Sequence, residues 1–321
     1  MTFRISKKLI LTALTILTAF LLAGCKDYTI ESQALRDEGI SLMQTGDYYG
    51  ACTKFDIALS LSNGRITQLE RDISFYKAAA LYAANDYEHA LIVYNALIKY
   101  DPEDWRSYFL RGCCYVAAGD IAAATADYTS AANINPSYQL YIQMYENLNQ
   151  HGYTNQGIEF INDALVLKDE SAEGYYYRGR IYYMLAQYDQ ANTQLSAAVQ
   201  KGSVEAKVYL AKVYRHYGDE ASASMLLMEY VRSDSVTADA LAELGDIELN
   251  AGNFDEALSY YNAGLDMEAS EHVRTQLLRG RVACLEHLLR WNEAKSAIRE
   301  YLAEAPDDEE ARREQKFIES R

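Results

Sequence analysis

The stretch Trp105–Tyr138 reads WRSYFLRGCCYVAAGDIAAATADYTSAANINPSY and holds one complete copy of the pattern that decides the fold. Within it, Ala124 is followed four residues later by Tyr128 and seven residues later by Ala131. This spacing places the three side chains on one face of an α-helix. Gly119, five residues before Ala124, suits the left-handed end of a preceding helix. The stretch therefore predicts two helices joined by a tight turn.

The same pattern recurs about every 34 residues along the chain. The small residue that opens each second helix is found at Ala51, Ala90, Ala124, Gly157, Ala191, Ala223, Ala257 and Ala294. Each is followed four residues on by a large apolar residue and seven residues on by a mostly small or apolar one. The only prolines, Pro102, Pro136 and Pro306, are 34 and 170 residues apart, which fits the same period. Such a period is typical of a helical array in which each repeat packs on its neighbours.

Glycine and alanine mark two further places in each repeat. Turn glycines precede the second helix at Gly46, Gly119, Gly152, Gly218 and Gly252. Small residues on the first helix are Gly39, Ala78, Gly112, Gly179, Ala211 and Gly245. Glycine inside a helix costs about 1 kcal/mol relative to alanine. Its recurrence there predicts that two helix backbones approach too closely for a Cβ atom to fit.

With these residues the chain resembles the tetratricopeptide repeat (TPR) family. The residues of 105–138 that match its consensus are Tyr108, Gly112, Tyr115, Gly119, Ala124, Tyr128, Ala131 and Pro136. The resemblance implies an all-α fold, an α-solenoid forming a right-handed superhelix of about eight helix-turn-helix repeats over residues 32–306. Residues 307–321 are expected to form a polar capping helix, with Phe317 and Ile318 facing inward. Repeat four is degenerate, repeat eight lacks its turn glycine, and about five residues are inserted near 63–66.

The amino terminus carries a second signal. Arg4, Lys7 and Lys8 precede an apolar run that is short for a membrane span and ends in Leu22-Ala23-Gly24-Cys25. This ending resembles the bacterial lipoprotein signal, which implies that residues 1–24 are cleaved and that the Cys25 thiol carries a diacylglyceryl lipid of the palmitate type. Residues 25–31 would then be a short linker. The alternative is an ordinary signal anchor in which Cys25 is incidental. The predicted location is the bacterial cell envelope, outside the cytoplasm.

Charge and motif content exclude several functions. Without residues 1–24 the chain carries 27 basic against 46 acidic residues, a formal charge of −19. So acidic a protein is not expected to bind nucleic acid, which requires clustered Lys and Arg. No metal-ligand spacing, phosphate loop or nucleophile motif is present, so we expect no metal, no cofactor and no enzyme. Cys52, Cys113, Cys114 and Cys284 lie in repeats too far apart to form a regular set of disulfides and are expected to be small packing residues.

The family resemblance implies a ligand surface on the concave face, built from the first helix of each repeat. Transferred onto this chain, its positions are Phe75, Tyr82, Arg106, Phe109, Ile142, Glu146, Tyr176, Arg180, Tyr183, Lys212 and Arg215. They form an aromatic set with a basic flank at Arg180, Lys212 and Arg215. Exposed tyrosine and arginine are common hot spots of protein interfaces. The aromatic residues could equally be covered by neighbouring repeats.

Two functions follow from this surface. The first is a lipid-anchored scaffold or adaptor that holds a peptide segment or a partner protein, with the basic flank meeting acidic groups. The second is a carbohydrate- or cell-wall-binding lipoprotein in which the same tyrosines stack on sugar rings. The sequence does not distinguish a peptide from a glycan ligand, and it leaves the oligomeric state open.

Overall fold

The structure is a computed structural model that describes residues 28–233 and 236–321. These residues form seventeen α-helices and no strand, so the fold is an all-α helical repeat solenoid, as the sequence predicts. The chain divides into two compact units, one ending at Phe160 and one beginning at Ile161. The two units are described separately.

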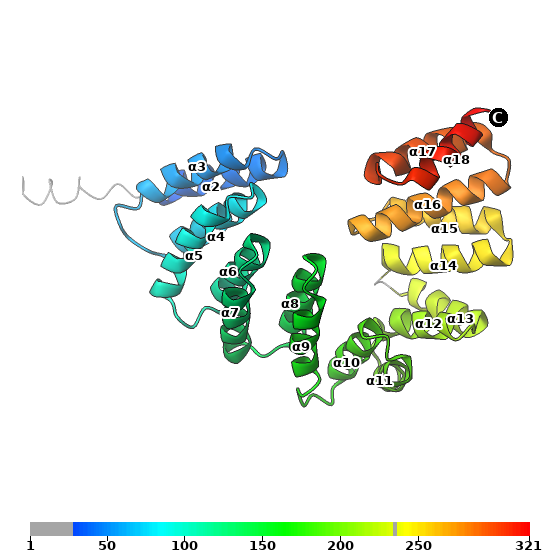
Figure 1. Ribbon diagram of the computed structural model, residues 1–321, viewed down its shortest axis with the longest axis horizontal. Helices are drawn as coiled ribbons and strands as arrows, with labels where there is room; N and C mark the ends of the chain where they lie inside the picture. Colours follow the sequence, from blue (N-terminus) through cyan, green and yellow to red (C-terminus); the bar gives the residue numbers. More distant parts are fainter. Residues whose placement is uncertain (1–27, 234–235) are drawn as a thin grey trace, which may run out of the picture. The chain divides into compact units, whose positions relative to one another are not determined.

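Unit 1 is a succession of paired helices joined by short turns (Figure 1). Its helices are α2 (Thr29–Gln44), α3 (Tyr48–Ser60), α4 (Gln68–Ala83), α5 (Tyr87–Tyr100), α6 (Trp105–Ala118), α7 (Ile121–Ile134) and α8 (Tyr138–Gln150), and the boundary between the units falls within α9 (Thr154–Ala164). Within this unit each helix from α2 to α8 packs on the next, and α2 also packs on α4 and α6 on α8.

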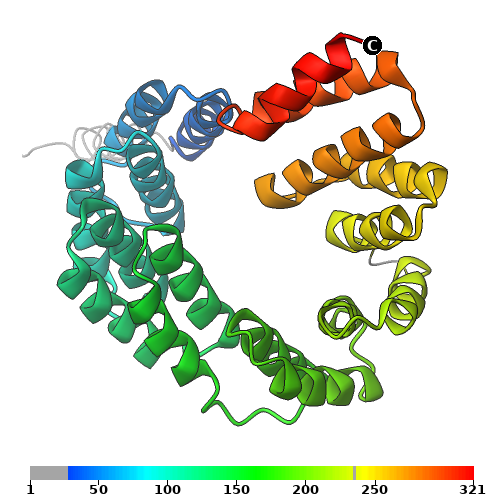
Figure 2. The same ribbon diagram turned by 45° about the vertical axis from the view of Figure 1, so that its right-hand side comes forward.

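Unit 2 continues the same helix-turn-helix succession (Figure 2). Its helices are α10 (Ala172–Met184), α11 (Tyr188–Gln200), α12 (Ala206–His216), α13 (Glu220–Val231), α14 (Ala238–Ala251), α15 (Phe254–Leu265), α16 (Glu271–His287), α17 (Trp291–Glu304) and α18 (Glu309–Glu319). The last of these, α18, packs on α17 at the position where a cap is expected. First helices also pack on one another, α10 on α12 and α14 on α16.

Each turn between paired helices has a glycine or a substitute in the left-handed conformation. Gly46, Gly119, Gly152, Gly218 and Gly252 have φ between 79° and 84°, which confirms their predicted role. Asn85, Ala186 and Leu289 adopt φ of 56–60° in the repeats that lack a turn glycine. The second helix then begins at an aspartate in four repeats, where Asp47, Asp86, Asp120 and Asp219 accept a hydrogen bond from the backbone N–H three residues on.

The small–large faces of the second helices form the core, as predicted. Ala124, Tyr128 and Ala131 are fully buried, and the equivalent residues of the other repeats are buried as well. At Gly39, Gly112 and Gly245 the nearest atoms belong to a side chain and not to a second backbone, whereas at Gly179 an added Cβ would also lie 3.1 Å from the backbone nitrogen of Leu195. A Cβ atom at Gly112 would lie 2.4 Å from Cε1 of Tyr128, sixteen residues later. Glycine is therefore needed because the large side chain of the paired helix fills its space.

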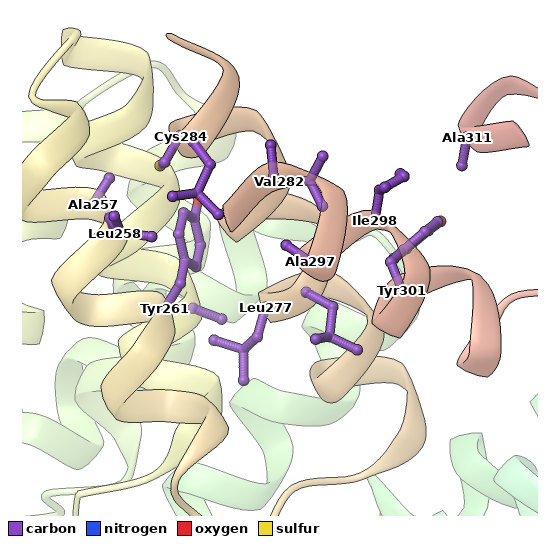
Figure 3. Packing of buried hydrophobic residues seen from close by; sticks show 14 of the residues in the cluster. Ala257, Leu258, Tyr261, Leu277, Val282, Cys284, Ala297, Ile298, Tyr301 and Ala311 are labelled. Atoms are coloured by element: carbon purple, nitrogen blue, oxygen red, sulfur yellow. The ribbon is translucent and has the colours of Figure 1, made fainter. Parts of the chain in front are cut away.

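The same relation recurs in both units. Added Cβ atoms at Gly39, Gly179 and Gly245 would meet Phe55, Leu195 and Tyr261 at 2.4–2.5 Å. Figure 3 shows the resulting core in unit 2, where Tyr261 of α15 lies beside Leu277 and Cys284 of α16. Each of these helix pairs is thus held together by a large side chain seated on a small one. The packing energy of such a contact is local, as expected for a repeat array.

The capping helix differs from its prediction in one residue. Ala311 and Ile318 of α18 are fully buried, whereas Phe317 is 46% exposed. Phe317 lies edge-on to Trp291, with ring centroids 6.0 Å apart, and the Arg321 guanidinium lies 4.5 Å above its ring. The expectation that Phe317 faces inward is therefore wrong. Phe317 is displaced by about 100° around the helix from Ile318 and packs beside Trp291 instead.

The four cysteines Cys52, Cys113, Cys114 and Cys284 are buried free thiols, which confirms their predicted role as packing residues. Burial raises the pKa of the Cys113 thiol to about 11 and that of Cys284 to about 12.

The predicted signal peptide and Cys25 lie outside the described residues. Within the described ranges, no helix is both long and apolar enough to cross a membrane.

Candidate partner-binding surfaces

The predicted ligand residues all lie on first helices of the helix pairs. In unit 1 they are Phe75 and Tyr82 on α4, Arg106 and Phe109 on α6, and Ile142 and Glu146 on α8. In unit 2 they are Tyr176, Arg180 and Tyr183 on α10, and Lys212 and Arg215 on α12. We call these sets the first-helix surfaces of unit 1 and unit 2.

The aromatic residues of the unit 1 surface are partly buried in the core. Phe109 stacks on the buried ring of Tyr128 with centroids 5.6 Å apart. Tyr82 packs on Tyr87 at 5.5 Å, and burial raises the pKa of its hydroxyl. Ile142 is 3% exposed and is therefore a core residue. The aromatic rings Phe75, Tyr82 and Phe109 are half-buried, and Glu146 on α8 is exposed.

A cavity of about 430 Å³ opens on the unit 1 surface between three first helices. Its lining residues are Gln33, Arg36, Gln68, Leu69, Arg71, Asp72, Phe75 and Arg106. The Arg106 guanidinium lies 5.6 Å above the Phe75 ring, so two predicted residues meet here. Two further arginines, Arg36 and Arg71, come from α2 and α4 and were not among the predicted ligand residues. We call this feature the arginine pocket.

The unit 2 surface is organised around Tyr209, a residue of α12 that is absent from the predicted ligand residues. Its ring lies 5.9 Å from that of Tyr176 and 5.7 Å from that of Tyr183, both in edge-on geometry. The Arg180 guanidinium lies 5.7 Å and the Lys212 ammonium 5.4 Å from the centre of the same ring. Four of the five predicted residues of this unit therefore converge on one tyrosine.

Burial raises the pKa values of two tyrosine hydroxyls in this cluster. Removal from water raises the pKa of Tyr176 to about 12 and raises that of Tyr183, so both remain neutral hydrogen-bonding groups at neutral pH. Tyr209 lies three residues before Lys212, and residues three apart share a helix face. That spacing is the signal by which the sequence could have identified it.

Two of the three residues of the expected basic flank, Lys212 and Arg215, are neutralised by carboxylates of the protein itself. Lys212 Nζ lies 2.9 Å from Asp239 Oδ1 and 3.7 Å from Glu243 Oε1. Arg215 pairs with Glu243 and lies 3.6 Å from Asp246 Oδ2. Glu220 adds a further carboxylate 3.5 Å from Arg215 Nε. Two cations therefore face four carboxylates, so Lys212 and Arg215 do not form the positive patch that was expected.

This charge network is structural in character. Glu243 is 8% exposed, and its two cationic partners retain 16% and 21% of their side-chain exposure. Burial alone would lower the pKa of Lys212, but the carboxylates of Asp239 and Glu243 outweigh it and raise that pKa. Asp239, Glu243 and Asp246 follow each other at spacings of four and three residues on α14, a helix that the transferred ligand positions did not include.

Taken together, the two surfaces offer aromatic area and guanidinium donors, several of which are paired with carboxylates of the protein itself. Among the described residues, no group of three or more His, Cys, Asp or Glu side chains is arranged to hold a metal ion. The arrangement suits the reversible binding of a ligand through ring faces and N–H donors.

The chain is similar in sequence and in fold to known repeat proteins. A family model described as Tetratricopeptide repeat matches residues 36–99, 77–138 and 226–272. Tetratricopeptide repeat protein 33 of Mus musculus is 29% identical over 113 residues, which make up 35% of this chain and 40% of that protein. The chain thus matches less than half the length of this curated relative.

Two solved structures resemble the fold. A tetratricopeptide repeat protein from Parabacteroides merdae aligns with a TM-score of 0.51 and 15% identity, covering 78% of this chain and 98% of that one. The Cut9–Hcn1 hetero-tetramer of the APC/C aligns with a TM-score of 0.53 and 17% identity, covering 93% of this chain and 58% of that one. At these identities the likeness concerns the fold alone. A tetratricopeptide repeat model therefore matches residues 36–138 and 226–272 of this all-α helical repeat solenoid, and repeats of that type generally serve as scaffolds for protein–protein interaction.

Proposed function

We propose that this chain is a lipid-anchored scaffold of the bacterial cell envelope that holds a segment of a partner protein on its first-helix surfaces. The observation that carries the proposal is the convergence of Tyr176, Tyr183, Arg180 and Lys212 on Tyr209. Repeats of this type commonly bind protein or peptide partners. A cluster of half-buried tyrosines beside cations offers a large, rigid contact area with little side-chain entropy to lose on binding.

The anchoring part of the proposal is supported by the sequence Leu22-Ala23-Gly24-Cys25 after a basic and apolar segment. A diacylglyceryl group supplies the two acyl chains that stable membrane attachment requires. The remainder of the chain carries a formal charge of −19, which disfavours attachment to an anionic bilayer by charge. Lipid on Cys25 is therefore the device that we propose for membrane attachment.

Anchoring is tested by replacing Cys25 with serine. Metabolic labelling with an alkyne-bearing palmitate should tag the wild-type protein and leave Cys25→Ser untagged, and the wild type should sediment with membranes. A control, Cys284→Ser, removes a buried thiol and should keep the label. Equal labelling of Cys25→Ser and the wild type would remove the lipid anchor from the proposal.

Partner binding is tested with Tyr176→Ala and Tyr209→Ala combined. Cross-linked partners recovered with the wild type should be lost from this variant and retained by Tyr49→Ala with Tyr217→Ala, because these two tyrosines are exposed at 60% and 48% and lie outside the cluster. Circular dichroism must show equal helix content in both variants. If the cluster variant loses binding to sugars on a glycan array and no protein partner, the carbohydrate-binding alternative replaces the scaffold.

A further inference from the structure

The end of unit 1 at which α2 begins carries large exposed apolar side chains, namely those of Ile30, Ile57, Ile66 and Tyr100. Ile30 is 81% and Ile66 is 54% exposed. These residues belong to three stretches, 28–32, 57–74 and 93–101, which we call the linker edge. We propose that the linker edge lies against the membrane and inserts these side chains among its lipids. The inference rests on the lipid anchor proposed above.

Contacts between the three stretches show that they form one edge. The Ser32 hydroxyl donates to the Ala58 carbonyl oxygen at 3.2 Å, which joins the start of α2 to the end of α3. The Tyr100 hydroxyl at the end of α5 donates to the carbonyl oxygen of Ile66, in the loop after α3, at 3.4 Å. The start of α2 and the loops after α3 and α5 accordingly lie on one side of unit 1 (Figure 1).

The short connection to Cys25 keeps this edge close to the proposed anchor. Helix α2 begins at Thr29, four residues after Cys25. Four residues span at most about 14 Å, because an extended chain covers no more than ~3.6 Å per residue. The lipid on Cys25 places that residue at the bilayer surface. No orientation of unit 1 can therefore carry the start of α2 far from the membrane.

A hollow of about 270 Å³ in the linker edge has a mostly apolar wall. Its apolar lining residues are Leu59, Ile66, Val93, Ala96, Leu97 and Tyr100. Contact with lipid tails removes such apolar surface from water, which is favourable. Tyrosine is enriched where a membrane meets water, as Tyr100 would be here. Arg65 and Arg71 also line the hollow, and long basic side chains can keep their charge in water while their stems contact lipid.

The linker edge also avoids most of the repulsion that this acidic chain would meet at an anionic bilayer. Its charged residues are Arg65, Arg71 and Lys99 against Glu31, Glu70, Asp72 and Asp101, which sum to −1. The whole chain without residues 1–24 carries −19. Asp72 pairs with Arg36 at 3.1 Å and Asp101 with Arg71 at 3.3 Å, so two of these carboxylates are compensated. The edge can therefore approach anionic lipids at little electrostatic cost.

The test uses the acylated full chain in vesicles of phosphatidylcholine and phosphatidylglycerol whose acyl chains carry bromine, a contact quencher of tryptophan. Ile66→Trp places the probe on the linker edge. Tyr49→Trp is the matched control, because Tyr49 is 60% exposed and lies about 16 Å along α3 from the last residue of that helix. After subtraction of the wild-type emission, the lipids should quench the tryptophan of Ile66→Trp and not that of Tyr49→Trp. Circular dichroism should show wild-type helix content in both variants.

A second pair of variants needs no added ring. Ile66→Asn should speed transfer of the acylated protein from donor to acceptor vesicles about tenfold, because the burial of one isoleucine side chain in lipid is lost. Tyr49→Asn should transfer at the wild-type rate.

Several results would overturn the proposal. Equal quenching of Ile66→Trp and Tyr49→Trp, or equal transfer of Ile66→Asn and Tyr49→Asn, on vesicles that carry the protein would refute the membrane contact and leave the lipid anchor intact. Protection of the Ile66→Trp probe from iodide that grows with protein concentration in detergent would assign the edge to a second copy of the chain. Failure of the wild type to float with vesicles would refute the anchor itself, and the membrane contact with it.

Discussion

Replacing Glu243 with glutamine tests whether the cations of the unit 2 surface are structural. The Glu243 carboxylate is 8% exposed and pairs with Arg215, and its Oε1 lies 3.7 Å from Lys212 Nζ. Glutamine keeps the volume and one acceptor oxygen but removes the charge. The substitution therefore isolates the electrostatic contribution of this carboxylate to the network.

The magnitude follows from the remaining partners. Breaking a buried ion pair and leaving one charge uncompensated costs about 3–5 kcal/mol. Here Lys212 keeps Asp239 at 2.9 Å and Arg215 keeps Asp246 at 3.6 Å, so part of that cost is avoided. We expect Glu243→Gln to lower the free energy of unfolding by about 2 kcal/mol.

The assay is urea-induced unfolding followed by far-ultraviolet circular dichroism, with Glu38→Gln as the matched control. Glu38 pairs with Lys54 at 2.6 Å, but the two side chains are 56% and 37% exposed, and such pairs contribute about 0.5 kcal/mol or less. If Glu243→Gln is no more destabilising than Glu38→Gln, the network is not structural. Lys212 and Arg215 would then be available to acidic ligands.

Three further perturbations have expected outcomes. Leu289→Gly should stabilise the protein to urea by about 0.5–1 kcal/mol, because Leu289 has φ of 57° and left-handed backbone costs other residues about 1–2 kcal/mol; a loss of stability would contradict this. Glu286→Gln should remove a pH dependence of unfolding. Burial and a hydrogen bond to Glu314 raise the pKa of Glu286 from 4.5 to about 7, so the folded state binds a proton at this carboxyl more tightly than the unfolded state does. Protonation of Glu286 therefore stabilises the fold below pH 4.5, and this contribution is lost as the pH rises to about 7. An unchanged pH profile in the Gln variant would reject this assignment. Gly245→Ala should destabilise unit 2 by about 1–2 kcal/mol, since its Cβ would lie 2.5 Å from the Tyr261 ring, and the cost should shrink in a Tyr261→Leu background; equal cost in both backgrounds would show that the ring is not the obstacle.

The fold could be predicted because its determinants are local and repeated. Ala124, Tyr128 and Ala131 lie within two turns of one helix, and the pattern recurs often enough that exceptions in single repeats do not obscure it. The turn glycines were equally clear, since a positive φ is a backbone requirement that few other residues meet. Which residue a first-helix glycine makes room for was not visible, because it depends on packing sixteen residues away.

The candidate site was predicted less completely, because charges pair across helices. Lys212 and Arg215 were identified as a basic flank from their own helix, while the carboxylates that neutralise them come from α14. Tyr209 was missed because the ligand positions transferred from the family do not include it. The arginine pocket joins residues of three helices, and only a structure shows that Arg36, Arg71 and Arg106 line one cavity.

Photo-cross-linking in cells shows whether the first-helix surfaces hold a partner segment. A benzophenone amino acid is placed at Tyr176 or Arg106 on the first-helix surfaces, and at Ile92 or Met225 as controls. The controls lie on second helices and are each 59% exposed. We expect a discrete cross-linked partner at Tyr176 and Arg106 and none at Ile92 or Met225. Cross-links of equal yield at all four positions, or at the two control positions only, would contradict it.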